Sequence, residues 1–196
     1  MSTKEHILSR YRKNINVGEQ YDMPNLDALQ GVTYTDPVAQ FISMSNTVGA
    51  KVAELEKDAD INGLIKRLYP EVKVFASNMA EITIATLNPD TVGTAQELNG
   101  TDVGIVRGEL GVAENGCVWI PQTMKERAVC FISEYLVIVL SRRAIVSNMH
   151  QAYARINMTD YGYGTFISGP SKTADIAQAL VMGAQAARGV TVILTD

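Results

Sequence analysis

The sequence contains few of the residues that metal and redox chemistry require. Its 196 residues include two cysteines and two histidines. Cys117 and Cys130 each stand beside an apolar run and form no CxxC pair, so we interpret both as buried apolar side chains. The histidines, His6 and His150, show no HxxxH or HExxH spacing. The sequence therefore predicts no metal site in this chain.

A strong excess of one charge is missing as well. The net charge of −4 and the isoelectric point near 5.2 argue against nucleic acid or an anionic membrane surface as the main partner. The chain has no apolar run long enough to span a bilayer, and its start lacks the pattern of a signal peptide. We expect a cytoplasmic protein that binds no nucleic acid and inserts into no membrane.

Several familiar catalytic motifs are also absent. The sequence has no GxxxxGK(S/T) phosphate loop and no GxGxxG dinucleotide fingerprint. It shows neither a paired-carboxylate motif nor the residue order of a Ser-His-Asp triad. Any chemistry must therefore be sought in the loops that the fold brings together.

The pattern that is present predicts one α/β domain. The length fits a single domain with a substantial core. Strand-like and helix-like segments alternate, which predicts a three-layer α/β fold with a mainly parallel sheet and helices on both faces. The expected βαβ units are strand 51–55, helix 60–69 and strand 72–76, and then strand 165–168, helix 173–182 and strand 190–194. An almost wholly apolar segment, 136–140, predicts a further buried strand.

The N-terminal region has a different character. Ser2 or Thr3 can cap a first helix that places Ile7, Leu8 and Tyr11 on one face. Periodicity is then lost up to residue 34, which predicts an N-terminal helix and extended arm over 1–34 and an α/β domain over 35–196. The arm either wraps the body or a neighbouring subunit, giving a homodimer, or is an unstructured extension.

The first chemical candidate is the polar turn that follows strand 165–168. If a helix begins near Thr173, its free N–H groups and positive dipole end favour an anion. The turn would bind that anion through Ser168, Gly169, Ser171, Lys172 and Thr173. The alternative is that Ser171 and Thr173 only cap the helix while Lys172 is solvated.

The second candidate is Glu114, in the turn Ala113-Glu114-Asn115-Gly116. A carboxylate there can act as a nucleophile or general base, or it can be an ordinary surface residue. Residues 109–116 themselves fit either a short helix or a tight turn into strand 117–120. Both turns are expected at the carboxyl ends of strands, where open α/β sheets bind ligands, with Arg188 helping to hold the anion.

Several segments together resemble the lactate-utilisation (LUD) domain family, in particular its protein C branch. The resemblance rests on Val103-Gly104-Ile105, Gly111 to Gly116, the run Phe166-Ile167-Ser168-Gly169-Pro170-Ser171-Lys172-Thr173-Ala174-Asp175-Ile176, and the ending from Gly183 to Leu194. The family usually reads Ala-Glu-Thr-Gly-Thr where this sequence has Asn115 and Cys117. It also usually has Gly-x-His-Gly-Pro where Gln185, Ala186 and Ala187 stand here, so any role of that histidine is lost.

The resemblance implies a fold related to ribose-phosphate isomerases and coenzyme A transferases. It further implies a non-redox part in the cytosolic oxidation of L-lactate to pyruvate, alongside iron–sulfur oxidoreductase partners. Because the chain lacks a run of cluster-binding cysteines, we expect no cofactor in this chain itself. The alternative is a stand-alone enzyme or binding protein for a small anionic metabolite: a carboxylate, a sugar phosphate or a coenzyme A thioester.

Overall fold

The protein is described from a computed structural model, which covers residues 2–14, 25, 31–157, 159, 161–176 and 179–196. The chain forms two compact units, Met1–Gln30 and Gly31–Asp196. The boundary thus falls four residues before the predicted division at residue 34. Two hydrogen bonds tie the start of the second unit to its body, because Val32 O accepts from Asn148 and Tyr34 N donates to Ser147 Oγ. Most of the predicted arm lies outside the described residues.

The first unit contains the predicted N-terminal helix, α1 (Thr3–Asn14). Ser2 Oγ accepts a hydrogen bond from Glu5 N, and Glu5 Oε2 accepts one from Ser2 N. This reciprocal pair is a capping box and explains why the helix begins where it does. None of the residues of α1 is buried.

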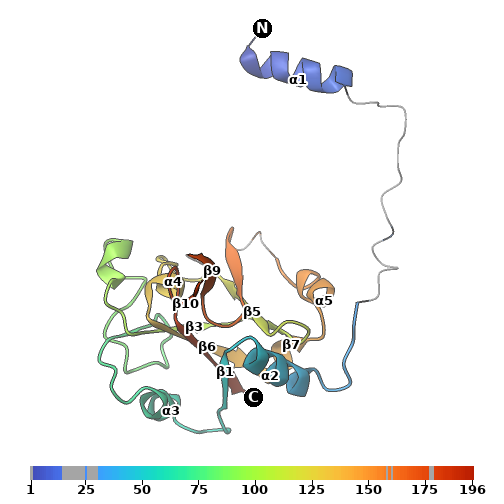
Figure 1. Cartoon of the computed structure of the whole chain (residues 1–196). Coiled ribbons are helices and arrows are strands. Elements are labelled where there is room, and N and C mark those ends of the chain that lie inside the picture. The colour runs from blue at the N-terminus through green and yellow to red at the C-terminus, as the bar shows by residue number, and fades with distance from the viewer. Residues whose placement is uncertain (1, 15–24, 26–30, 158, 160, 177–178) are drawn as a thin grey trace. The chain divides into compact units, whose positions relative to one another are not determined.

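The core of the second unit is a five-stranded, wholly parallel sheet (Figure 1). Its strands are, in order across the sheet, β1 (Lys51–Glu54), β11 (Gly189–Thr195), β6 (Tyr135–Ser141), β3 (Val103–Arg107) and β2 (Phe75–Ala76). The central strand, β6, is the apolar segment for which a buried strand was predicted. The mainly parallel α/β fold is therefore confirmed.

Helices cover both faces of this sheet. On one face lies α3 (Ile61–Leu68), whose buried Ile65 packs in one cluster with Ile105 of β3 and Val137 of β6. The opposite face packs on α2 (Pro37–Thr47) and α4 (Val129–Ile132). The chain passes from β1 at one edge of the sheet to β2 at the other edge. It then returns across the sheet through β3 and β6 to β11. Right-handed connections then require α3 to lie opposite the later elements, as it does.

A second, mixed sheet adds to the α2 and α4 face. Its strands are β7 (Ile145–Val146), β4 (Leu110–Val112), β5 (Cys117–Pro121) and β8 (Gly164–Ile167). The outer side of this sheet packs on α5 (Met149–Tyr153). Strands β4 and β5 are antiparallel and joined by the turn 113–116, which contains Asn115 and Gly116. The turn into β5 is therefore confirmed, and the alternative short helix over 109–116 is wrong.

The predicted helix 173–182 is wrong. The described part of this segment forms an antiparallel hairpin of β9 (Lys172–Ile176) and β10 (Ala179–Met182). Its base is held to the body, since Ser171 N donates to Ala187 O and Ser171 O accepts from Gly183 N. The predicted second βαβ unit fails with it, because β8 pairs antiparallel with β5 and not with the central sheet. The local sequence pattern favours a helix, but hydrogen bonds to distant residues stabilise the two strands.

Phe41 of α2 connects the layers, because it is fully buried in one cluster with Ile138 of β6 and Val118 of β5. We expect Phe41→Ala to lower the free energy of unfolding by about 3–5 kcal/mol, from lost burial and the cavity left behind. Ser43→Ala, at an exposed position of the same helix, should change it by less than about 0.5 kcal/mol. Urea unfolding followed by circular dichroism measures both, and a Phe41→Ala loss as small as the control's would contradict this packing.

Candidate functional site

The polar turn singled out in the sequence lines a cavity of about 400 Å³, here called the turn cavity. The turn follows β8, and the cavity is bounded by β8, α4, the amino-terminal ends of β6 and β11, and the loop 185–187. Ser168, Gly169, Ser171 and Lys172 all contribute to its wall, whereas Thr173 and Arg188 do not. Lys172 is the one charged side chain among the described residues that line it.

The turn is clamped to the C-terminal end of α2. Lys172 Nζ donates a hydrogen bond to Val48 O, at the residue that caps this helix. Gly169 has a positive φ of 66°, and a Cβ at this position would lie 2.5 Å from Val48 O. Only glycine therefore allows this approach. The lysine cation complements the negative end of the helix dipole and satisfies one of its terminal carbonyls.

The expected helix N-terminus does not exist at this turn. Thr173 lies in β9 and pairs with Val181, and Ser171 N already donates to Ala187 O. Neither residue therefore caps a helix, and the dipole argument for an anion site is wrong here. The binding roles of Ser168, Gly169, Ser171, Lys172, Thr173 and Arg188 stay predictions, supported for four of them by the cavity instead.

Glu114 lies in a turn that is hydrogen-bonded to the polar turn after β8. Ser168 Oγ donates to Asn115 O over 2.8 Å, which joins the two turns that the sequence marked as companions. The Glu114 carboxylate, however, accepts a hydrogen bond of 2.7 Å from Met149 N, in the first turn of α5. Together with Asn148, whose side chain accepts from Gln151 N, it satisfies two of the free amides at the start of this helix. The geometry thus gives Glu114 a helix-capping function, and its catalytic role stays a prediction.

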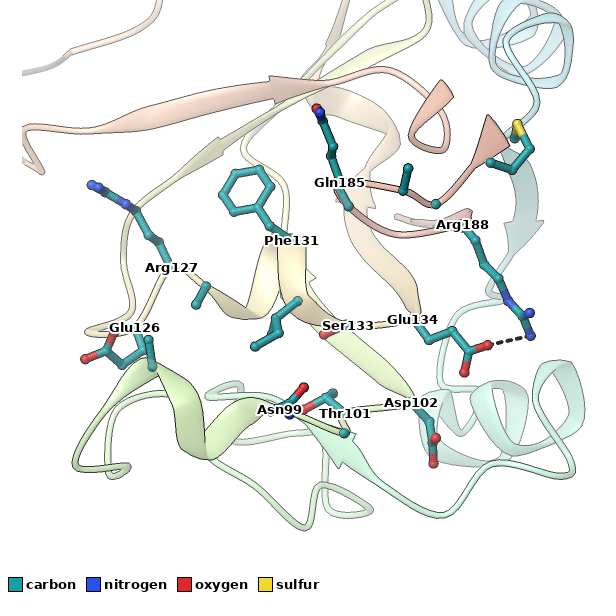
Figure 2. Close-up of a pocket in the computed structure, with 18 residues that line it drawn as sticks. Asn99, Thr101, Asp102, Glu126, Arg127, Phe131, Ser133, Glu134, Gln185 and Arg188 are labelled. Carbon is teal, nitrogen blue, oxygen red and sulfur yellow. Dashed lines mark ion pairs between the residues drawn. The ribbon is translucent and has the colours of Figure 1, made fainter. Parts of the chain in front are cut away.

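A larger cavity of about 1020 Å³ lies at the amino-terminal ends of β3, β6 and β11 (Figure 2). Arg188 lines this large cavity and pairs with Glu134 over 2.6 Å. Its guanidinium also donates to Tyr135 OH and lies 4.8 Å from the centre of the Tyr135 ring. The positive charge of Arg188 is therefore already balanced by a carboxylate.

Three residues line both cavities: Phe131, Gln185 and Ala186. Figure 2 shows Phe131 on α4 and Gln185 on the loop before β11. Sequence reasoning did not select Phe131. It did mark Gln185 and Ala186 as departures from the family pattern, and that was the available signal for this loop.

The expected position at the carboxyl edge of the central sheet is wrong. The turn cavity lies instead near the amino-terminal ends of β6 and β11. The two turns follow β8 and β4, and both of these strands belong to the second sheet. At the carboxyl edge the structure has ion pairs instead. Arg142 of the short turn after β6 pairs with Glu54 at the end of β1 over 2.7 Å, and Arg107 of β3 pairs with Glu81.

Neither cysteine is a ready nucleophile. Cys130 lines the turn cavity but is 3% exposed, and burial raises its pKa to about 12. Burial also raises the pKa of Cys117 to about 12. Both thiols are thus protonated near neutral pH, as the interpretation of buried apolar residues requires.

The described residues contain no group of three or more His, Cys, Asp or Glu side chains that could hold a metal ion. None of the helices in this part of the chain is long and apolar enough to cross a membrane.

We expect Glu114→Ala to lower the free energy of unfolding by about 1 kcal/mol, because Met149 N loses its acceptor. Glu114→Gln keeps a side-chain oxygen there and should cost less. The exposed Glu56 provides the matched control, since Glu56→Ala removes a carboxylate that caps no described helix. Urea denaturation at neutral pH measures all three variants, and a Glu114→Ala protein as stable as the wild type would refute the capping function.

Comparison with known proteins places this fold. Residues 38–195 match the LUD domain family. Lactate utilization protein C from Shouchella clausii (strain KSM-K16) is 30% identical in an alignment of 116 residues, and this match covers 56% of this chain and 50% of that protein. The chain thus spans about half the length of this curated relative. The crystal structure of a DUF162 family protein from Deinococcus radiodurans superimposes with a TM-score of 0.64 at 15% identity, over 85% of this chain and 100% of the other, which supports the fold. The chain belongs to the LUD domain family.

Proposed function

We propose that this protein is a non-redox component of cytoplasmic L-lactate utilisation. The observation that carries the proposal is the match of residues 38–195 to the LUD domain, together with the similarity to a lactate utilization protein C. Oxidation of L-lactate to pyruvate releases two electrons, which need an acceptor. Two cysteines are too few for the four thiolates of an iron–sulfur cluster. The electrons therefore pass to iron–sulfur oxidoreductase partners, and this chain holds no cofactor of its own.

The turn cavity is the proposed place for a carboxylate. Ser168, Ser171 and Lys172 line it, and Lys172 is the one charged side chain among the described residues of its wall. The ammonium group of a lysine carries three donors, of which the bond to Val48 O uses one. The remaining donors can bind a carboxylate while α2 stays capped.

Deletion of the gene tests the proposed pathway. We expect the deletion strain to grow poorly on lactate as sole carbon source and normally on glucose, since only lactate oxidation needs the protein. The gene supplied in trans should restore growth. Normal growth of the deletion strain on lactate would reject the role.

A second candidate is a stand-alone enzyme or binding protein for a small anionic metabolite, such as a carboxylate, a sugar phosphate or a coenzyme A thioester. The large cavity favours it by its volume of about 1020 Å³, although its lining carries the carboxylates Asp102, Glu126 and Glu134 beside Arg127 and Arg188. Turnover of such a metabolite by the purified chain without partners would distinguish this candidate from the first.

We also propose that the N-terminal region mediates a homodimer. In α1, Ile7 and Tyr11 are 62% and 64% exposed, and an isolated helix of 12 residues is marginal in water. A partner surface would stabilise it.

Removal of residues 1–30 should therefore convert a dimer into a monomer, as measured by light scattering. The second unit should keep its unfolding midpoint, because the hydrogen bonds of residues 31–34 remain. Equal oligomeric states of the full and shortened chains would contradict a dimer built on this region.

A further inference from the structure

We infer that the large cavity binds helix α1 of a second copy of this chain, so that two copies exchange their N-terminal helices. The inference rests on the homodimer proposed above and names the surface that receives the helix. It concerns a contact between copies, in which α1 of one copy meets the second unit of the other.

The exposed apolar face of α1 is the first argument. Ile7, Leu8 and Tyr11 follow the spacing i, i+1 and i+4, which places them on one side of the helix. Lys4 lies one turn before Ile7 on the same side. None of the residues of α1 is buried. An amphipathic helix of this kind can bind another surface through its apolar face.

The exposed apolar side chains of the large cavity are the second argument. Ile132 of α4 and Met182 of β10 line it and are 36% and 43% exposed. The half-buried Phe131 adds an aromatic ring to the same lining. Exposed apolar side chains that gather at one place mark interaction sites. The volume of about 1020 Å³ leaves room for several side chains of a helix.

The third argument is that the carboxylates of the large cavity are only partly neutralised. Its lining contains three carboxylates and two guanidinium groups, those of Asp102, Glu126, Glu134, Arg127 and Arg188. Figure 2 shows the ion pair between Glu134 and Arg188. Asp102 and Glu126 have no ion-pair partner among the residues that the structure describes. The cavity therefore offers two carboxylates to a cationic partner.

The charges of α1 are complementary to these carboxylates. The helix has a single acidic residue, Glu5, and four basic ones, Lys4, Arg10, Arg12 and Lys13. The guanidinium of Arg127 lies 4.3 Å from the centre of the Tyr163 ring, and Tyr163 is not part of the cavity lining. Opposite charges on two surfaces steer their encounter and fix their register. The acidic lining thus favours a basic helix over an acidic one.

The chain between α1 and the second unit is long enough for an exchange. Residues 15–30 can span at most roughly 55 Å when fully extended, which allows α1 to reach a neighbouring molecule. In a two-fold dimer each copy gives its helix and receives the other, so the contact forms twice. Such a dimer is closed and does not continue into a filament.

Sedimentation equilibrium of the full chain measures the dissociation constant of the dimer. Ile7→Asp on the helix and Met182→Asp in the cavity should each raise it at least about tenfold, because a carboxylate replaces a buried apolar side chain. Ser9→Asp on the opposite side of α1 is the control for the helix. Leu68→Asp, at an exposed position of α3 outside the large cavity, is the control for the cavity. Both controls should stay within about threefold of the wild type.

A mixture of the two weakened variants tests the exchange itself. The Ile7→Asp chain keeps an intact cavity and the Met182→Asp chain keeps an intact helix, so together they can form one of the two contacts. The mixture should contain more dimer than either variant alone at the same total concentration. If Met182→Asp lowers the urea midpoint of the second unit, Ile132→Asp on α4 takes its place.

Charge reversal in the cavity tests the electrostatic part. Glu126→Lys should raise the dissociation constant, because it places a cation opposite the basic helix. Glu71→Lys makes the same change at an exposed position outside the large cavity and should not.

A dissociation constant unchanged in both Met182→Asp and Ile132→Asp overturns the inference, and so does a mixture with no more dimer than its parts. If removal of residues 1–30 still gives a monomer, the homodimer stands and its contact lies elsewhere. A full chain that is monomeric at millimolar concentration rejects the homodimer and the inference together.

Discussion

The alternation of side chains along β6 holds the second unit together. Leu136, Ile138 and Leu140 enter the cluster that contains α2, α4 and the second sheet, while Val137 and Val139 enter the cluster under α3. All five side chains are at most 3% exposed. A shift of this strand by one residue would exchange the two sets of side chains. The register with β3 and β11 is thus fixed from both faces, and so is the place of Leu136 on the wall of the turn cavity.

Sequence predicted the elements whose pattern agrees with their final surroundings. The apolar run at β6 and the Asn115-Gly116 turn could both be predicted, because burial and turn chemistry act there locally. The hairpin β9–β10 was not readable. Its residues fit the periodicity of a helix as well as that of a strand. Hydrogen bonds between Ser171 and residues more than ten positions away stabilise the hairpin. The pairing of β8 with β5 depends likewise on distant partners.

The turn that the sequence selected lines a cavity, but the reason first given for an anion site there does not hold. The sequence predicted an anion site at the turn 168–172 from a helix dipole that is absent there. The turn lines a cavity in which Lys172 is the one charged side chain among the described residues. The sequence also predicted that the site lies at the carboxyl ends of the parallel strands. That rule applies to loops that follow strands of the parallel sheet, and β8 belongs to the other sheet. The sequence could not predict that Phe131 and Val190 line a cavity, because it does not distinguish apolar residues on a cavity wall from those that fill the core.

The clamp between this turn and α2 has a consequence for binding. Lys172 is tied to Val48 O, and Gly169 lies against the same carbonyl, so the charged group is positioned by the fold before any ligand arrives. A free lysine side chain loses rotamer freedom when it binds an anion, at a cost of roughly 0.5–1.5 kcal/mol. Part of that cost is already met here when the helix end is capped. Helix capping and the proposed anion binding at Lys172 are therefore compatible, since the ammonium group has three donors and the cap uses one of them.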